Sequence, residues 1–96
     1  MPVKTPQNRI GVKEAVQAAR AAVQELLPAS DLNDLQLEEV EQSEDEKYWL
    51  ITLGFYERPT GIESQINPFA KGARKYKLFK VDAESGKVRA MKIRTV

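Results

Sequence analysis

Two charged clusters hold most of the side chains that could do chemistry in this 96-residue chain. Neighbouring carboxylates can bind a hard cation such as Ca²⁺ or Mg²⁺, and lysine and arginine can bind phosphate. The acidic cluster comprises Glu38, Glu39, Glu41, Glu44, Asp45 and Glu46, and the basic cluster comprises Lys71, Arg74, Lys75, Lys77, Lys80, Lys87, Arg89, Lys92 and Arg94. Because the chain contains no cysteine and no histidine, a Ser-His-Asp or Cys-His arrangement and a thiolate metal site are excluded.

The acidic cluster lacks the ligand spacing and the turn glycine of a calcium loop. Strict alternation along a strand would also send Glu38 and Glu39 to opposite faces of a sheet. We therefore expect no metal and no cofactor, and we interpret these carboxylates as a solvated strand followed by a polar turn at 43–46. Catalysis by the remaining ionisable side chains would need a pocket that shifts their pKa values, so we expect a protein that is not an enzyme.

The basic cluster gives the end of the chain a charge opposite to the rest. Residues 1–70 hold 12 acidic and 6 basic residues, whereas residues 71–96 hold 9 basic and 2 acidic residues. One hypothesis is nucleic-acid binding, with Tyr76 or Phe79 stacking on bases, through Lys75, Lys77, Lys80, Lys92 and Arg94. We keep it as the alternative hypothesis, because the net charge is only +1, no RNP, KH or helix-turn-helix pattern is present, and glutamates on neighbouring strands could neutralise these cations.

A helix is the first element predicted to position these clusters, over residues 12–27. Its apolar residues recur at helical spacing and form one stripe, which contains Val12, Ala15, Val16, Ala19, Val23, Leu26 and Leu27. Gly11 and Glu14 resemble a capping box at its start, and Pro28 ends it.

Four strands are predicted after the helix, at residues 35–42, 47–57, 76–83 and 87–94. In the first strand the alternation slips between Leu37 and Val40, which indicates a β-bulge. Gly54 predicts a bulge or close packing, and Gly86 predicts a turn with positive φ between the last two strands. We assign to the helix the odd-numbered face of the second strand, which carries Trp49, Ile51, Leu53 and Phe55.

The predicted fold is α+β, with one N-terminal helix on one face of a four-stranded antiparallel meander sheet. Residues 1–96 form a single domain, in which we expect residues 1–10 to be a flexible N-terminus and residues 57–74 to be a long loop between the second and third strands. The start of the chain does not resemble a signal peptide, and no stretch is apolar enough to cross a membrane. We therefore expect a cytoplasmic protein that does not bind a membrane.

The even-numbered face of the second strand is also apolar, and we expect the helix to leave it uncovered. Such a face is typical of a surface that binds a protein partner or another copy. We assign to this surface Tyr48, Leu50, Tyr56, Phe69, Tyr76 and Leu78. Two other interpretations stay open: the tyrosines could cover lysine stems, or Ile62, Ile66 and Phe69 of the loop could fold back over the face.

The stretch YKLFKVDAESGKVRAMKI, residues 76–93, resembles the C-terminal hairpin of PepSY-like domains, in which an aromatic-rich strand leads to a similar V-D-A and G-K-V turn. The helical pattern EAVQAA also precedes the strands in that family, and the chain resembles uncharacterised small bacterial proteins. The resemblance implies a non-catalytic module, and some PepSY domains inhibit an associated peptidase. The apolar residues on both faces of the second strand and the long loop lead to our main hypothesis, a non-enzymatic protein-interaction module that contacts a partner or another copy through the uncovered sheet face and loop 57–74.

Overall fold

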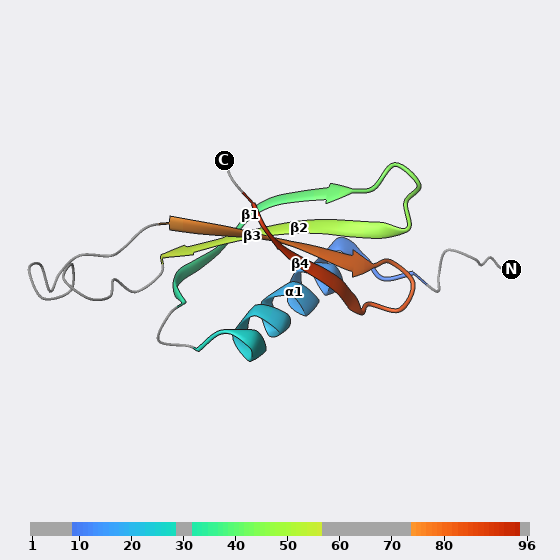
Figure 1. Ribbon diagram of the computed structural model, residues 1–96. Coiled ribbons are helices and arrows are strands. Elements are labelled where there is room, and N and C mark those ends of the chain that lie inside the picture. Colours follow the sequence, from blue (N-terminus) through green and yellow to red (C-terminus); the bar gives the residue numbers. More distant parts are fainter. Residues whose placement is uncertain (1–8, 29–31, 57–73, 95–96) are drawn as a thin grey trace, which may run out of the picture.

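A computed structural model describes residues 9–28, 32–56 and 74–94. These residues form one helix, α1 (Val12–Leu26), and four strands, β1 (Asn33–Gln42), β2 (Tyr48–Tyr56), β3 (Arg74–Asp82) and β4 (Val88–Ile93). The strands lie in the order β1-β2-β3-β4, and each pairs antiparallel with its neighbour. Figure 1 shows α1 against one face of this sheet. The predicted α+β meander is confirmed.

The helix α1 packs one stripe of small side chains on the sheet. Ala15, Ala19 and Val23 are fully buried. The carboxylate of Glu14 accepts the N–H of Gly11 at 3.0 Å, which satisfies one of the backbone donors that a helix leaves unpaired at its start. No helix in the described ranges has the length and hydropathy to span a membrane.

The core lies between α1 and the odd-numbered face of the central strands, as predicted. Five side chains of β2 and β3 are at most 1% exposed: Ile51, Leu53, Phe55, Phe79 and Val81. Trp49 packs at the margin of this core, and its indole N–H donates to the carbonyl oxygen of Ile10 at 3.2 Å. The expected assignment of the odd-numbered face of β2 to the helix is therefore confirmed.

The chain before α1 is tied to the end of the sheet from Arg9 onwards, although we expected residues 1–10 to be flexible. The N–H of Ile10 donates to the carbonyl of Ala83 at 2.7 Å, and its side chain packs against the core. The guanidinium of Arg9 donates to the carbonyl of Glu46 at 2.9 Å. These two contacts join the N-terminal segment to the β3–β4 turn and the β1–β2 turn.

The strand β1 contains the predicted bulge, and the bulge changes where its carboxylates point. Its register with β2 shifts between Leu37 and Glu39, so one extra residue breaks the alternation. Glu39 lies opposite Thr52, and Glu38 lies over Gly54. Both carboxylates therefore project from the face away from α1, and the prediction that they occupy opposite faces was wrong.

The hairpin between β3 and β4 forms the expected tight turn. Gly86 adopts a φ of 76°, where a residue with a Cβ is strained. The carboxylate of Asp82 accepts the N–H groups of Glu84 at 2.8 Å and Ser85 at 3.0 Å. At the other end of the hairpin, β3 begins at Arg74, two residues before the predicted start, so Arg74 belongs to the sheet rather than to loop 57–74.

Candidate functional site: the open face of the sheet

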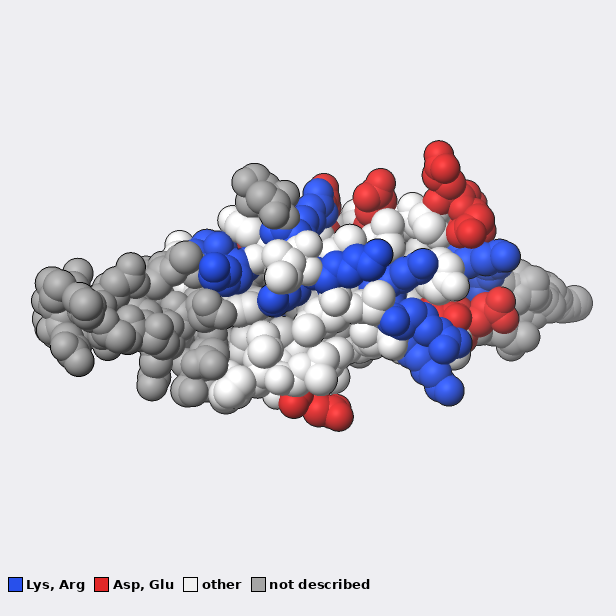
Figure 2. All heavy atoms as spheres, viewed as in Figure 1, with Lys and Arg blue, Asp and Glu red and all other residues white. Residues whose placement is uncertain are grey.

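We call the side of the sheet away from α1 the open face. Directly paired residues of an antiparallel sheet project from the same side, so the register defines its members. They include Glu38, Glu39 and Glu41 on β1; Tyr48, Leu50, Thr52 and Tyr56 on β2; Arg74, Tyr76, Leu78, Lys80 and Asp82 on β3; and Lys92 and Arg94 at the last strand. Figure 2 shows Lys and Arg gathered over β3 and β4, with Asp and Glu along the margin formed by β1 and the β1–β2 turn.

Two arginines reach across the open face to its acidic edge. Arg94 donates to the hydroxyl of Thr52 at 2.8 Å and forms an ion pair with Glu39. Arg74 forms an ion pair with Glu38, and this hydrogen-bonded partner holds the pKa of Arg74 above its ordinary value. Part of the basic cluster is thus neutralised by the acidic cluster, as the charge pattern suggested.

One end of the open face is organised around Arg74. Its Cζ atom lies 4.9 Å from the ring centroid of Tyr56 and 6.0 Å from that of Tyr76, a geometry in which the ring face attracts the cation. A Cβ atom at Gly54 would lie 2.6 Å from Oε2 of Glu38. Gly54 therefore allows the Glu38–Arg74 pair to lie close to the sheet, which confirms the expected close packing.

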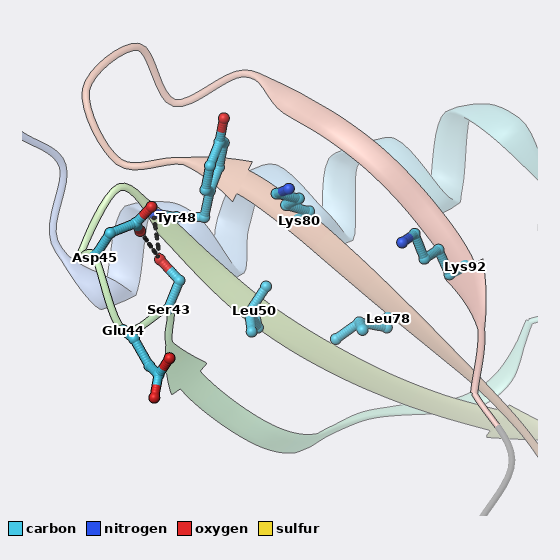
Figure 3. A pocket seen from close by; sticks show the side chains of 8 residues that line it. All are labelled: Ser43, Glu44, Asp45, Tyr48, Leu50, Leu78, Lys80 and Lys92. Carbon is cyan, nitrogen blue, oxygen red and sulfur yellow. Dashed lines mark hydrogen bonds between the residues drawn. The ribbon is translucent and has the colours of Figure 1, made fainter.

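The opposite end of the open face contains a hollow of about 510 Å³ beside the β1–β2 turn. Leu50 and Leu78 supply its apolar surface, and Lys80 and Lys92 stand along one side (Figure 3). The ammonium of Lys80 lies 4.2 Å from the ring centroid of Tyr48, so the tyrosine ring holds that lysine over the sheet.

The acidic wall of the hollow is shaped by the β1–β2 turn. The hydroxyl of Ser43 donates to the carboxylate of Asp45 at 2.7 Å, and the N–H of Lys47 donates to the same carboxylate at 3.0 Å. Both bonds lower the pKa of Asp45, and the bond from Ser43 has the larger effect. This wall therefore carries negative charge at neutral pH. Within the described ranges, no group of three or more acidic side chains is arranged to hold a metal ion.

The cations of the open face differ in whether an acid already pairs with them. Arg74 and Arg94 are paired with glutamates. In contrast, Lys80 and Lys92 have no ion-pair partner among the residues that the structure describes. The unneutralised positive charge of the open face is therefore concentrated at the hollow, next to apolar side chains.

The structure separates the residues predicted to bind a partner into two groups. Three of them line the hollow: Tyr48, Leu50 and Leu78. Tyr56 and Tyr76 lie with Arg74 at the other end. Phe69, like the rest of the loop and its possible folding over the face, lies outside the described residues.

The residues of the nucleic-acid hypothesis do not share one face. Lys75 and Lys77 pair with Phe55 and Leu53, so they project on the side of α1. The other three members lie on the open face: Lys80, Lys92 and Arg94. Lys75 and Lys77 therefore lie on the face opposite to the one on which the last strand places Lys92 and Arg94.

Sequence reasoning assigned Lys80 and Lys92 to the nucleic-acid hypothesis and Leu50 and Leu78 to partner binding, and so missed that the four side chains form one hollow. It also missed the contribution of Ser43. In the register of the sheet, Leu50 lies opposite Lys80 and Leu78 opposite Lys92. The short turn at Gly86 sets the register of β3 with β4, so the pair of Leu78 and Lys92 could have been predicted. No short turn sets the register of β2 with β3, so the pair of Leu50 and Lys80 could not.

Comparison with protein-family models, with curated proteins and with solved structures finds no match. The likeness to PepSY-like domains therefore stays a prediction from the sequence pattern.

Proposed function

We propose that this protein is a non-enzymatic interaction module whose open face binds an extended acidic segment of a protein partner. The observation that carries the proposal is the hollow, where Lys80 and Lys92 lack an acidic partner among the described residues and flank the apolar surface of Leu50 and Leu78. An apolar side chain of the partner enters the hollow, and carboxylates on either side of it meet the two ammonium groups. Charge complementarity of this kind selects a partner and speeds association.

A protein segment accounts for the open face better than a nucleic acid does. The regularly spaced phosphates of a nucleic acid would meet Glu39, Glu41 and the acidic wall of the hollow, all of which repel them, whereas a peptide can place its few carboxylates beside the two lysines alone. Both arginines of that face are already engaged, Arg94 by Thr52 and Glu39 and Arg74 by Glu38. An acidic segment with apolar residues uses both the leucines and the lysines of the hollow.

The hollow has the dimensions of a small recognition pocket. Its volume of about 510 Å³ falls within the range of roughly 300–1,000 Å³ that is typical of ligand pockets. It is therefore large enough to admit an apolar side chain of a partner. The remaining contacts of a longer segment lie along β2 and β3 toward Arg74.

The test is titration of the 15N-labelled protein with a synthetic peptide of alternating glutamate and leucine, followed by NMR. We expect the largest amide shifts at the hollow, with Leu50, Leu78 and Lys80 among them. The double variant Lys80→Glu with Lys92→Glu should weaken binding about tenfold or more, because each attraction becomes a repulsion.

The matched control is Lys75→Glu with Lys87→Glu, which changes the net charge equally but lies outside the hollow. We expect it to bind the peptide as the wild type does. Equal weakening by both double variants would mean that only net charge matters, and shifts confined to the α1 side would place binding elsewhere; either result overturns the proposal. An oligonucleotide that binds more tightly than the peptide would favour the nucleic-acid hypothesis instead.

A further inference from the structure

The sheet ends in two edge strands, β1 and β4, and neither outer edge is paired within the described residues. The N–H of Arg94 donates to the carbonyl of Tyr76 at 2.9 Å. Because backbone groups of an antiparallel edge strand alternate between inward and outward, those of Ile93 point outward. Ile93 is 80% exposed, and Leu37 on β1 is 42% exposed, so each edge also presents an apolar side chain.

The two edges carry opposite charge. On the open face, β1 presents Glu41 and the last strand presents Lys92, neither of which has an ion-pair partner among the described residues, whereas Glu39 and Arg94 pair with each other within one copy. Pairing of β1 with another β1 would bring carboxylates together, and pairing of β4 with another β4 would bring cations together; charged edges of this kind prevent like-with-like association. Only the unlike pairing, β1 against β4, brings attractive charges into contact.

The meander also makes the unlike pairing geometrically simple. In a four-stranded antiparallel meander β4 runs opposite to β1, so a second copy in the same orientation continues the antiparallel alternation. Its helix then lies on the same side as the first helix. On that side Ile93 of one copy meets Leu37 of the next, and on the open face Lys92 of one copy meets Glu41 of the next.

We infer that this protein associates with itself head to tail, with β4 of one copy pairing to β1 of the next to form a continuous sheet. The inference shares Lys92 with the hollow but otherwise rests on the backbone and the apolar side chains of the sheet edges, so the variants at Leu37, Ile93 and Leu50 test it separately from the proposed function. Such an interface uses two different surfaces and therefore extends to rings or open chains. The attraction is between exposed charges, so added salt weakens it.

Sedimentation or light scattering over a range of concentrations tests the inference with two single variants and their mixture. The wild type should exceed the 10.8 kDa mass of the chain increasingly as concentration rises into the millimolar range. Leu37→Lys disables β1 and Ile93→Lys disables β4, so each variant alone should be monomeric. An equimolar mixture should form a species of twice the chain mass and nothing larger, because each variant still supplies one intact edge.

Three further variants distinguish association through the sheet edges from association through another surface or through unfolding. Ile93→Pro removes an outward N–H without breaking the ladder to β3, and it should give a folded monomer by circular dichroism. Leu26→Lys changes an exposed leucine of α1 (59% exposed) and should associate as the wild type does. Leu50→Lys changes the hollow and should also leave the association unchanged.

Each contrary outcome overturns the inference. A wild type that is monomeric at every concentration excludes the association. A Leu37→Lys variant that still dimerises indicates symmetric pairing through β4, and a mixture that stays monomeric shows that the two edges do not recognise each other. Loss of association in Leu50→Lys alone assigns the contact to the open face.

Discussion

Arg94 donates a 2.8 Å hydrogen bond to Thr52 from a strand position two strands away. Thr52 is 2% exposed and is the one buried polar residue in the described ranges, and the ion pair with Glu39 holds Arg94 from the far side. The guanidinium thus covers the centre of the open face. It separates the hollow from the tyrosine pair around Arg74, so the open face offers two small surfaces rather than one continuous apolar patch.

Arg94→Met removes the hydrogen-bond donor from Thr52, and we expect a loss of about 1 kcal/mol in the free energy of unfolding, because water replaces part of the bond. Thr52→Val removes the acceptor and should cost a similar amount. The double variant should lose less than the two single losses combined, by about 0.5–1 kcal/mol, because the second change has no bond left to break. Urea unfolding followed by the fluorescence of the single tryptophan measures all three variants, and strictly additive losses would show that the bond contributes nothing.

Gly54→Ala places a methyl group where the Cγ atom of Glu38 lies 2.9 Å away and Nη2 of Arg74 lies 3.0 Å away. We expect it to displace the ion pair and to destabilise the fold by about 1 kcal/mol. Combining it with Glu38→Ala removes the clash, so the double variant should be hardly less stable than Glu38→Ala alone. Thermal unfolding measures the difference; an equal cost of Gly54→Ala in both backgrounds would contradict the role assigned to Gly54.

Gly86→Ala forces a Cβ atom into a backbone with a φ of 76°, and it should cost about 1 kcal/mol of stability. The space around Gly86 is not the reason, because the nearest atom to such a Cβ is Cγ2 of Ile10 at 3.6 Å, an ordinary contact. Gly86→Asn is the matched control: asparagine tolerates positive φ better, so its loss in chemical denaturation should be smaller. A larger loss for asparagine would show that packing, not φ, controls this position.

Acid should weaken the β3–β4 turn through Asp82. The N–H groups of Ser85 and Glu84, and the charge of Arg89, hold the pKa of Asp82 below its ordinary value of 3.8. Because the folded pKa is the lower one, the turn's contribution is complete above the unfolded pKa and is lost as the pH falls through the folded pKa. Asp82→Asn keeps an acceptor oxygen but does not titrate, so its melting temperature should fall less than that of the wild type between neutral pH and about pH 2.

Glu84→Gln is the control for that measurement, since it removes a carboxylate of the same turn whose side chain accepts no hydrogen bond within the described residues. Its melting temperature should follow that of the wild type across the same pH range. If the melting temperature of Asp82→Asn falls with pH as much as that of the wild type, other carboxylates dominate acid unfolding.

The sequence alone predicts the parts of this fold that depend on neighbouring residues. The stripe of Ala15, Ala19 and Val23 predicts the buried side of α1 because helical spacing places these residues together. Alternation in β2 predicts which side faces the core, and the slip after Leu37 predicts the bulge. Gly86 predicts its turn because few other residues adopt positive φ without strain.

The site depends on relationships that no local pattern contains. The position of Glu38 on the open face was missed, because the extra residue of the bulge moves every side chain on one side of it to the other face of the sheet. The register of β2 against β3 is not set by a short turn, so only the folded sheet places Leu50 beside Lys80. What the sequence determined by itself was the set of elements and the side of β2 that is buried, since both follow from spacing along the chain. What only the tertiary structure decided was which charges neutralise each other, and that Lys80 and Lys92 are the cations of the open face without an ion-pair partner among the described residues, since these depend on distances between strands.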